Sequence, residues 1–180
     1  GVPGLFKCWL KKNVGIVNAI GTGVADDKVV YSYVNKMITY YLGEQPILDQ
    51  VETYLCHDET HKKYVIENIS KLVVKPANAS GGYGIVIGPK APKKEIDETI
   101  IKINKNPREY IAQPLEILST APTITEHDIE PRHLDLRPFI LTGKTNYVTT
   151  GGLTRVALRK GSTIVNSSQG GGSKDTLIVD

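Results

Sequence analysis

The sequence has few cysteines, no long apolar run and little excess charge, and each shortage excludes a class of protein. Two cysteines, Cys8 and Cys56, are too few for a disulfide framework, so we expect a reducing cytoplasm. No apolar run approaches the roughly 20 residues of a membrane-spanning helix. The first residues, GVPGLFKCWLKK, do not follow the order of a signal peptide. A net charge of +3 is too small to indicate nucleic acid or an anionic membrane as a partner.

What the sequence does contain is the composition of an ordinary soluble domain, with 40% hydrophobic and 23% charged residues. A length of 180 residues allows one domain or two small lobes around a shared cleft. The chain begins without Met, enters a strand-like run early, and stops at TLIVD, a run with the pattern of a strand interior. We therefore expect a fragment or excised part of a longer protein.

The apolar pattern predicts an α+β chain in two lobes. Strands are expected at 14–20, 51–55, 72–75, 85–88, 110–113, 133–137, 139–141, 147–150, 154–158 and 163–165. Asp26 or Asp27 can cap a helix that ends at Gly43, with Val30, Val34, Met37, Ile38 and Tyr41 on its buried face. A second helix starts after Asp58 and runs to about Ser70, and a third covers 93–104.

The sharpest local signal is the run VVKPANASGGYG at 73–84. Lys75 closes a predicted strand, and the loop after it holds three glycines, which let backbone N–H groups approach phosphate oxygens. A hairpin that merely uses glycine in its turn explains the loop about as well. The loop is not a Walker A motif, because the Gly143-Lys144-Thr145 run has Pro138 where that motif requires its first glycine.

Other candidate motifs are weaker. Gly21-Thr22-Gly23 comes after a predicted strand as a dinucleotide fingerprint would, but the third glycine position holds Asp26, whose carboxylate repels a pyrophosphate. Lys28 is either a solvated lysine of a first helical turn or a phosphate ligand.

Two groups of polar side chains have metal-like or catalytic spacing. Cys56, His57 and His61 resemble half of a zinc site, yet the sequence has no second ligand pair, so a solvated helix edge is the preferred interpretation. His133 and Asp135 could form a base and its orienting carboxylate, but a polar sheet face explains them better because the sequence places no nucleophile beside them.

Six blocks together resemble one family. They are NAIGTGVADDK (18–28), YYLGEQPIL (40–48), VVKPANASGGYG (73–84), YIAQP (110–114), RHLDLRPFIL (132–141) and GGLTRVALRKGSTIVNSSQGGGSKDT (151–176). Their order and spacing resemble the circularly permuted ATP-grasp family that is similar to glutathionylspermidine synthase, over nearly the whole chain.

The resemblance implies two α+β lobes with mixed or antiparallel sheets that hold ATP and Mg²⁺ between them. It implies ligation of a small-molecule or peptide-like carboxylate to an amine through an acyl phosphate. It divides the chain into a strand–helix segment at 1–50, a small lobe with the glycine-rich loop at 51–114, and an incomplete large lobe at 115–180. Nucleic acid and membranes are not expected partners.

The resemblance also assigns site residues by position. Lys28 and Lys75 match the two phosphate-contacting lysines; Ser80, Gly81, Gly82, Tyr83 and Gly84 match the phosphate flap; Gln113, Pro114 and Leu115 match the adenine hinge; Arg137, Arg155 and Asn166, with the loop 170–172, match the catalytic end. The guanidinium fork suits phosphoryl or carboxylate oxygens, although a surface ion pair is the plain alternative for each arginine.

The metal ligands are unknown, and in the permuted order they are expected before Gly1. We therefore expect this chain alone to bind nucleotide weakly and to lack ligase activity. Two alternatives stay open, namely a non-catalytic nucleotide-binding or scaffolding module with the same fold and, less favoured, a Rossmann-type dehydrogenase.

Overall fold

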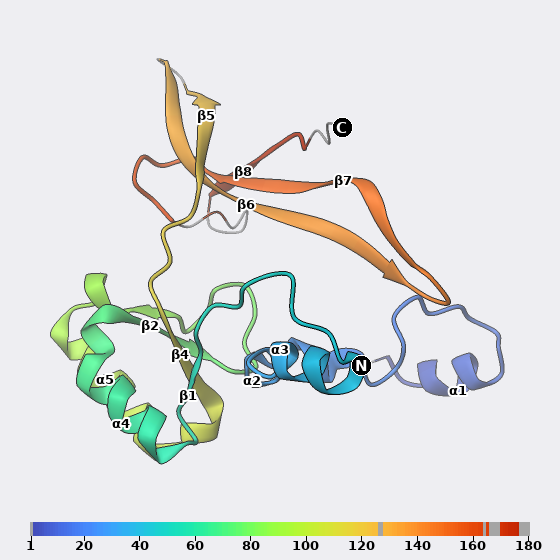
Figure 1. Cartoon of the computed structure of the whole chain (residues 1–180), viewed down its shortest axis with the longest axis horizontal. Helices are drawn as coiled ribbons and strands as arrows, with labels where there is room; N and C mark the ends of the chain where they lie inside the picture. The colour runs from blue at the N-terminus through green and yellow to red at the C-terminus, as the bar shows by residue number, and fades with distance from the viewer. Residues whose placement is uncertain (1, 126–127, 164, 166–169, 177–180) are drawn as a thin grey trace. The chain divides into compact units, whose positions relative to one another are not determined.

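The computed structural model describes residues 2–125, 128–163, 165 and 170–176, and it divides into two compact units (Figure 1). Unit 1 comprises residues 1–79 and 84–114, and unit 2 comprises 80–83 and 115–180. Each unit has its own four-stranded sheet, and all the pairings between described strands are antiparallel. The α+β class predicted from the sequence is therefore confirmed.

Unit 1 is built from short helices and a small sheet. Its elements are α1 (Leu5–Leu10), η1 (Thr22–Asp26), α2 (Lys28–Tyr31), α3 (Val34–Met37), η2 (Ile38–Leu42), β1 (Tyr54–Leu55), α4 (Glu59–Asn68), η3 (Ile69–Lys71), β2 (Leu72–Pro76), β3 (Val86–Ile87), η4 (Gly88–Lys90), α5 (Lys93–Lys105), η5 (Pro107–Glu109) and β4 (Tyr110–Pro114). The strands lie in the order β1-β4-β2-β3. Among the described helices, none is long and apolar enough to cross a bilayer.

The core of unit 1 forms where α4 and α5 pack on the two central strands. Val74 of β2 and Ala112 of β4 are opposite each other and fully buried. Val65 of α4 and Ile103 of α5 are equally buried in the same cluster. Close packing of this kind tolerates little change in volume, so these residues fix the pairing of β2 with β4.

Local sequence signals explain the two long helices. The Asp58 side chain accepts a hydrogen bond of 2.9 Å from the backbone N–H of His61, which caps α4 as predicted. Ile96, Ile100 and Ile103 face the core from α5, and the helix ends before Asn106-Pro107, again as predicted.

The first 50 residues differ from their predicted form. Residues 14–20 form no strand, and Val17 is 93% exposed. The apolar run misled the prediction because a buried strand needs a paired neighbour, and this segment has none among the described strands. Without a strand before Gly21, the Rossmann fingerprint loses its structural context.

The predicted helix from Asp27 to Gly43 is real but broken. It is divided into α2, α3 and the π-helical turn η2, and Gly43 ends it in a left-handed conformation with φ of 67°. Val29 is the buried residue of this run, whereas Tyr41 of the predicted buried face is 75% exposed. The 3.6-residue spacing correctly predicted helical turns, but the run is divided into three segments, and the expected buried face does not extend along all of them.

Unit 2 is dominated by a long hairpin. Its strands are β5 (Thr120–Ile124), β6 (Ile129–Thr142), β7 (Asn146–Ala157) and β8 (Gly171–Lys174), in that order in the sheet. Figure 1 shows β6 and β7 as a long paired ribbon that closes at the turn after Thr142. The turn at Gly143-Lys144 was predicted and is confirmed.

The strand pattern of unit 2 was predicted only in part. β6 and β7 are continuous where shorter strands were expected, with a register shift between Pro138 and Ile140. β5 and β8 were missed, because one contains Pro122 and the other is glycine-rich. Thr163 and Val165 lie outside strands. Residue 164 and residues 177–180, which make up most of the terminal TLIVD run, lie outside the described residues.

Gly88 generates a test of the packing beneath the sheet. A Cβ at this position would lie 1.8 Å from the carbonyl oxygen of Ile69 and 2.7 Å from that of Leu72. We expect Gly88→Ala to lower the free energy of unfolding by about 3 kcal/mol, since backbone must move to admit the methyl group. Urea unfolding measures this. Gly15→Ala, where a Cβ meets nothing within 4 Å, is the matched control, and an equal effect of both variants would contradict the packing argument.

Candidate functional site

Lys28 is positioned by the start of α2. The Asp27 carboxylate caps this helix by accepting a hydrogen bond of 2.8 Å from the N–H of Val29. Arg108 donates to the other carboxylate oxygen at 2.6 Å, and this contact, more than the cap itself, lowers the pKa of Asp27. The carboxylate next to Lys28 is thus already paired.

The Lys28 side chain reaches the loop after β2. Its backbone N–H donates to the carbonyl of Ala77 at 3.0 Å, and its ammonium donates to the carbonyl of Ala79 at 2.6 Å. These two bonds attach α2 to the first part of the glycine-rich loop. Lys28 is half-buried, so it is not the fully solvated lysine that the local sequence alone favoured.

Lys75 lies near the end of β2, and its ammonium donates to Gln113 Oε1 at 2.6 Å. The register explains the contact. Gln113 is opposite Val73 in the β2–β4 pair, so Lys75 reaches it diagonally across the same face of the sheet. Gln113 is only 7% exposed, and its amide donates in turn to Thr53 Oγ1 at 2.8 Å.

The two lysines lie within electrostatic reach of each other. Burial lowers the pKa of Lys75, and the positive charge of Lys28 lowers it further. Within the described part of the chain, neither ammonium forms an ion pair with a carboxylate. Two nearby cations whose polar partners are neutral make this corner of unit 1 complementary to an anion.

The glycine-rich loop connects β2 to β3, which pair as an antiparallel hairpin. Gly81, Gly82 and Gly84 all have φ between 70° and 81°. At Gly84 a Cβ would also lie 2.9 Å from Pro76 Cγ, so both backbone angle and space require glycine there. The loop is therefore a hairpin connection, but at 77–85 it is far longer than a tight turn needs.

The remaining flap and hinge residues lie at the ends of strands or on the surface. Ser80 is exposed, and Tyr83 exposes 75% of its surface. Pro114 pairs with Leu72 at the end of β4, and Leu115 comes next as the first residue of unit 2 on that side.

In unit 2, the arginines predicted at the catalytic end meet at Asp135. Arg155 donates to the two carboxylate oxygens of Asp135 at 3.1 Å and 2.7 Å, from the position opposite on β7. Arg137 lies 3.5 Å from the same carboxylate, and its side chain is half-exposed. The hydrogen bond to Arg155 lowers the pKa of Asp135 and raises that of Arg155.

The structure gives less information about the other residues predicted at the catalytic end, Asn166 and the loop 170–172. Asn166 lies outside the described residues. Gly171 and Gly172, expected in a loop, instead belong to β8 and pair with Ala157 and Val156 of β7. This corrects the predicted glycine loop at 170–172, whose composition hid a strand.

The weaker candidate motifs have structural explanations. Burial raises the pKa of the Cys56 thiol to about 11, and His61 Nδ1 accepts a hydrogen bond from the N–H of Leu55. His133 contacts the carbonyl of Leu118 at 2.7 Å. Among the described residues, no group of three or more His, Cys, Asp or Glu side chains could hold a metal ion.

Sequence reasoning missed Thr53 and the pairing of Arg108 with Asp27. Both contacts join residues far apart in the chain, so spacing gave no signal for them. The assignment of Gln113 to a hinge gave its side chain no role. The alternation of β4 could have supplied one, because it places Gln113 on the same face of the sheet as the strand-end lysine.

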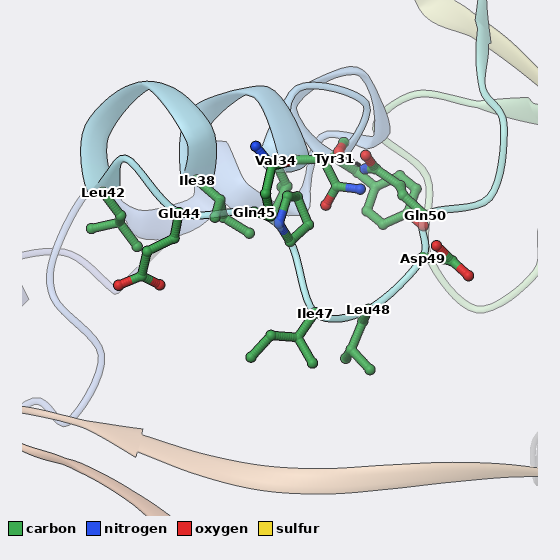
Figure 2. Close-up of a pocket in the computed structure, with 12 residues that line it drawn as sticks. Tyr31, Val34, Ile38, Leu42, Glu44, Gln45, Ile47, Leu48, Asp49 and Gln50 are labelled. Atoms are coloured by element: carbon green, nitrogen blue, oxygen red, sulfur yellow. Dashed lines mark hydrogen bonds between the residues drawn. The ribbon is translucent and has the colours of Figure 1, made fainter.

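Unit 1 also has an apolar hollow of about 650 Å³, lined by 12 residues from the segment between Tyr31 and Gln50 (Figure 2). Ile38, Leu42, Ile47 and Leu48 supply apolar lining side chains from η2 and the segment after it. None of the residues assigned to the nucleotide site lines this hollow. It is therefore separate from the lysine pair.

The ion pair in unit 2 gives a prediction about acid stability. The pKa of Asp135 is lower in the folded chain than in the unfolded one, so its stabilising effect is complete above the unfolded value of about 3.9 and is lost as the pH falls through the folded value. We expect Asp135→Asn to reduce the free energy of unfolding at pH 7 by about 1 kcal/mol after solvent screening, and the difference from wild type to shrink at low pH.

The measurement is urea unfolding followed through the NMR signals of β7 amides. Asp175→Asn makes the same charge change in unit 2 at an exposed position and should have little effect. A deficit in Asp135→Asn that stays constant from pH 7 to about pH 2 would contradict the electrostatic explanation.

Comparison with known proteins places the chain in a family. A family model described as circularly permuted ATP-grasp type 2 matches residues 1–157. An uncharacterized protein of Synechocystis sp. is 55% identical over 180 residues, which cover 99% of this chain and 37% of that protein. An uncharacterized protein of Mycobacterium tuberculosis is 51% identical over 180 residues, covering 99% of this chain and 33% of that protein.

A third relative has a functional name. The Frankia casuarinae protein named "Putative glutamate--cysteine ligase 2-2" is 51% identical over 178 residues, covering 99% of this chain and 20% of that protein. The chain thus spans between 20% and 37% of the length of these curated relatives. The family model covers most of the chain, and the chain belongs to the circularly permuted ATP-grasp type 2 family.

Proposed function

We propose that this chain supplies the ATP-binding core of an ATP-dependent carboxylate–amine ligase. Membership of an ATP-grasp family supports the use of ATP. The name of the Frankia relative, which describes a ligase, supports the class of reaction. The alternative of a nucleotide-binding module has the same fold and differs only in that no chemistry takes place once the nucleotide is bound.

The observation that carries the proposal is the pair of lysines in unit 1. Lys28 comes from the start of α2 and Lys75 from the end of β2, and the charge of one lowers the pKa of the other. Both lie at the root of the glycine-rich loop, to which Lys28 is attached through Ala79. A polyphosphate would relieve the repulsion between the two ammonium groups and accept their hydrogen bonds.

The proposed reaction has two steps. A carboxylate oxygen of the first substrate attacks the γ-phosphorus of ATP, forming an acyl phosphate and releasing ADP. The amine of the second substrate then attacks the acyl carbon, and phosphate leaves with the bonding electrons. In both steps the chain contributes position and positive charge rather than a covalent intermediate.

Each group in the site has a proposed part. Lys28 and Lys75 bind phosphate oxygens, residues 80–84 cover them, and the backbone groups of residues 113–115 meet the edge of the adenine ring, which leaves the Gln113 side chain free of the base. Arg137 and Arg155 neutralise the transferred phosphoryl group or hold the substrate carboxylate, and Asn166 lines the acceptor or phosphate end. Mg²⁺ would neutralise phosphate charge, but the described residues offer no cluster to hold it, so no ligand is assigned.

The substrates are proposed only as classes. The glutamate–cysteine name belongs to a protein of which this chain covers a fifth, so it does not carry a particular amino acid to this chain. The resemblance to glutathionylspermidine synthase that we infer from the sequence blocks favours a peptide-like carboxylate and an amine as substrates. The same proposal includes a cytoplasmic location and the division of the chain into the segments 1–50, 51–114 and 115–180.

Nucleotide binding tests the proposal directly. We expect isothermal titration calorimetry to detect Mg-ATP binding, and Lys28→Met and Lys75→Met each to weaken it by about tenfold or more, because each removes a charge-assisted hydrogen bond. Binding is the readout because the chain spans only part of its relatives. Lys94→Met, an exposed lysine of α5, is the matched control.

Two results would overturn the proposal. One is Mg-ATP affinity that is the same in wild type and both site variants. The other is tighter binding of NAD than of Mg-ATP, which would favour a dinucleotide enzyme. Adenosine, which has no phosphate, should bind all four proteins alike.

A further inference from the structure

A relay of three side chains crosses unit 1 beside the lysine pair. The ammonium of Lys75 donates to Gln113 Oε1 at 2.6 Å, and Gln113 Nε2 donates to Thr53 Oγ1 at 2.8 Å. The Thr53 hydroxyl donates to the carbonyl of Val51 at 2.9 Å. The relay runs from β2 through β4 to the segment that precedes β1.

The donors and acceptors of the relay fit in a single arrangement. An ammonium can only donate, so the amide must present its oxygen to Lys75. The Thr53 hydroxyl hydrogen is directed to Val51, so the hydroxyl oxygen accepts from the amide nitrogen. Reversing the Gln113 amide would set its NH₂ group against the ammonium and its oxygen against an oxygen whose hydrogen is already engaged.

The chemical type of the Lys75 partner is the unusual feature. A cation that is removed from water is ordinarily paired with a carboxylate. Within the described residues, Lys75 instead donates to a neutral amide, and the charge that acts on it is that of a second cation, Lys28. The amide accepts one hydrogen bond and so aims the ammonium, but it leaves the positive charge uncompensated.

We propose that Gln113 is a positioning residue that aims the Lys75 ammonium while leaving its charge for an anionic ligand, and that Thr53 fixes the amide in the orientation this requires. The inference rests on the proposed function, since the anion would be the phosphates of ATP. Among the described residues, Gln113 takes one of the three ammonium hydrogens, and in the proposed complex the other two would donate to phosphate oxygens.

Gln113→Glu tests the importance of a neutral partner. The two side chains are nearly identical in shape, but glutamate would form an ion pair with Lys75. We expect the Kd for Mg-ATP to rise by about tenfold or more, because the ligand must compete with an internal carboxylate, while the Kd for adenosine stays unchanged. The pKa of Lys75, followed by NMR of labelled lysine side chains, should rise.

Gln45→Glu is the matched control for net charge. Gln45 is exposed and lines the apolar hollow rather than the relay. Its substitution should change neither the Kd for Mg-ATP nor the pKa of Lys75. Equal Mg-ATP affinity in wild type and Gln113→Glu, with an unchanged Lys75 pKa, would overturn the proposal.

Thr53 supplies a second test that adds no charge. Thr53→Val keeps the shape but removes the hydroxyl acceptor, so the Gln113 amide loses its single orientation. We expect a several-fold rise in the Kd for Mg-ATP, a changed Gln113 side-chain NH₂ signal, and recovery of both in Thr53→Ser. A purely structural role would lower thermal stability without changing the ratio of Mg-ATP to adenosine affinity, and that result would count against the proposal.

The outcomes separate this inference from the proposed function. Suppose that wild type binds tripolyphosphate, that Gln113→Glu weakens this binding, and that neither protein prefers Mg-ATP to tripolyphosphate. The proposed function then fails and the positioning role stands. If wild type binds Mg-ATP and neither Gln113→Glu nor Thr53→Val alters it, the positioning role fails and the proposed function stands. Circular dichroism checks the fold of each variant. If Gln113→Glu does not fold, the comparison of Thr53→Val with Thr53→Ser tests the positioning role.

Discussion

The antiparallel pairing of β2 with β4 is the contact on which the rest of unit 1 depends. Val74 and Ala112 meet at its centre with no exposed surface, and Val65 and Ile103 pack over them from the two long helices. A shift of one residue in this register would send every side chain of β4 to the opposite face. The buried apolar residues therefore also determine where the polar ones lie, including the amide that meets the strand-end lysine.

Charged side chains have different kinds of hydrogen-bond partner in the two units. In unit 2, Asp135 and Arg155 are opposite each other on paired strands and form a two-point ion pair. In unit 1, the cations of the lysine pair have neutral partners and repel each other. The first arrangement stabilises the sheet, whereas the second keeps two like charges close together, which disfavours their charged forms. Because of this difference, the functional proposal rests on the lysines, and the arginines add no independent support to it.

The parts of the fold that could be predicted are those fixed by local rules. Asp58 capped α4, the isoleucines of α5 faced the core, and the turn at Gly143 closed the hairpin. The failures came where distant contacts decide the outcome. Residues 14–20 had the composition of a strand without a partner, and β8 had the composition of a loop but found a partner in β7.

The candidate site shows the same division. The resemblance supplied the lysines and the hinge, and the roles it assigned to them stay predictions. The contacts around those residues could not be read from spacing, because Lys75, Gln113 and Thr53 are joined across 38 and 60 positions of sequence. Only the strand register brings them together.

The different surroundings of the two thiols have a practical consequence. Cys8 is exposed on α1, whereas Cys56 is fully buried and its raised pKa keeps it protonated at neutral pH. Since the thiolate is the reactive form, a maleimide dye added at neutral pH should attach to Cys8 and leave Cys56 untouched. The wild-type chain thus has a natural attachment point for a single fluorophore near its amino terminus.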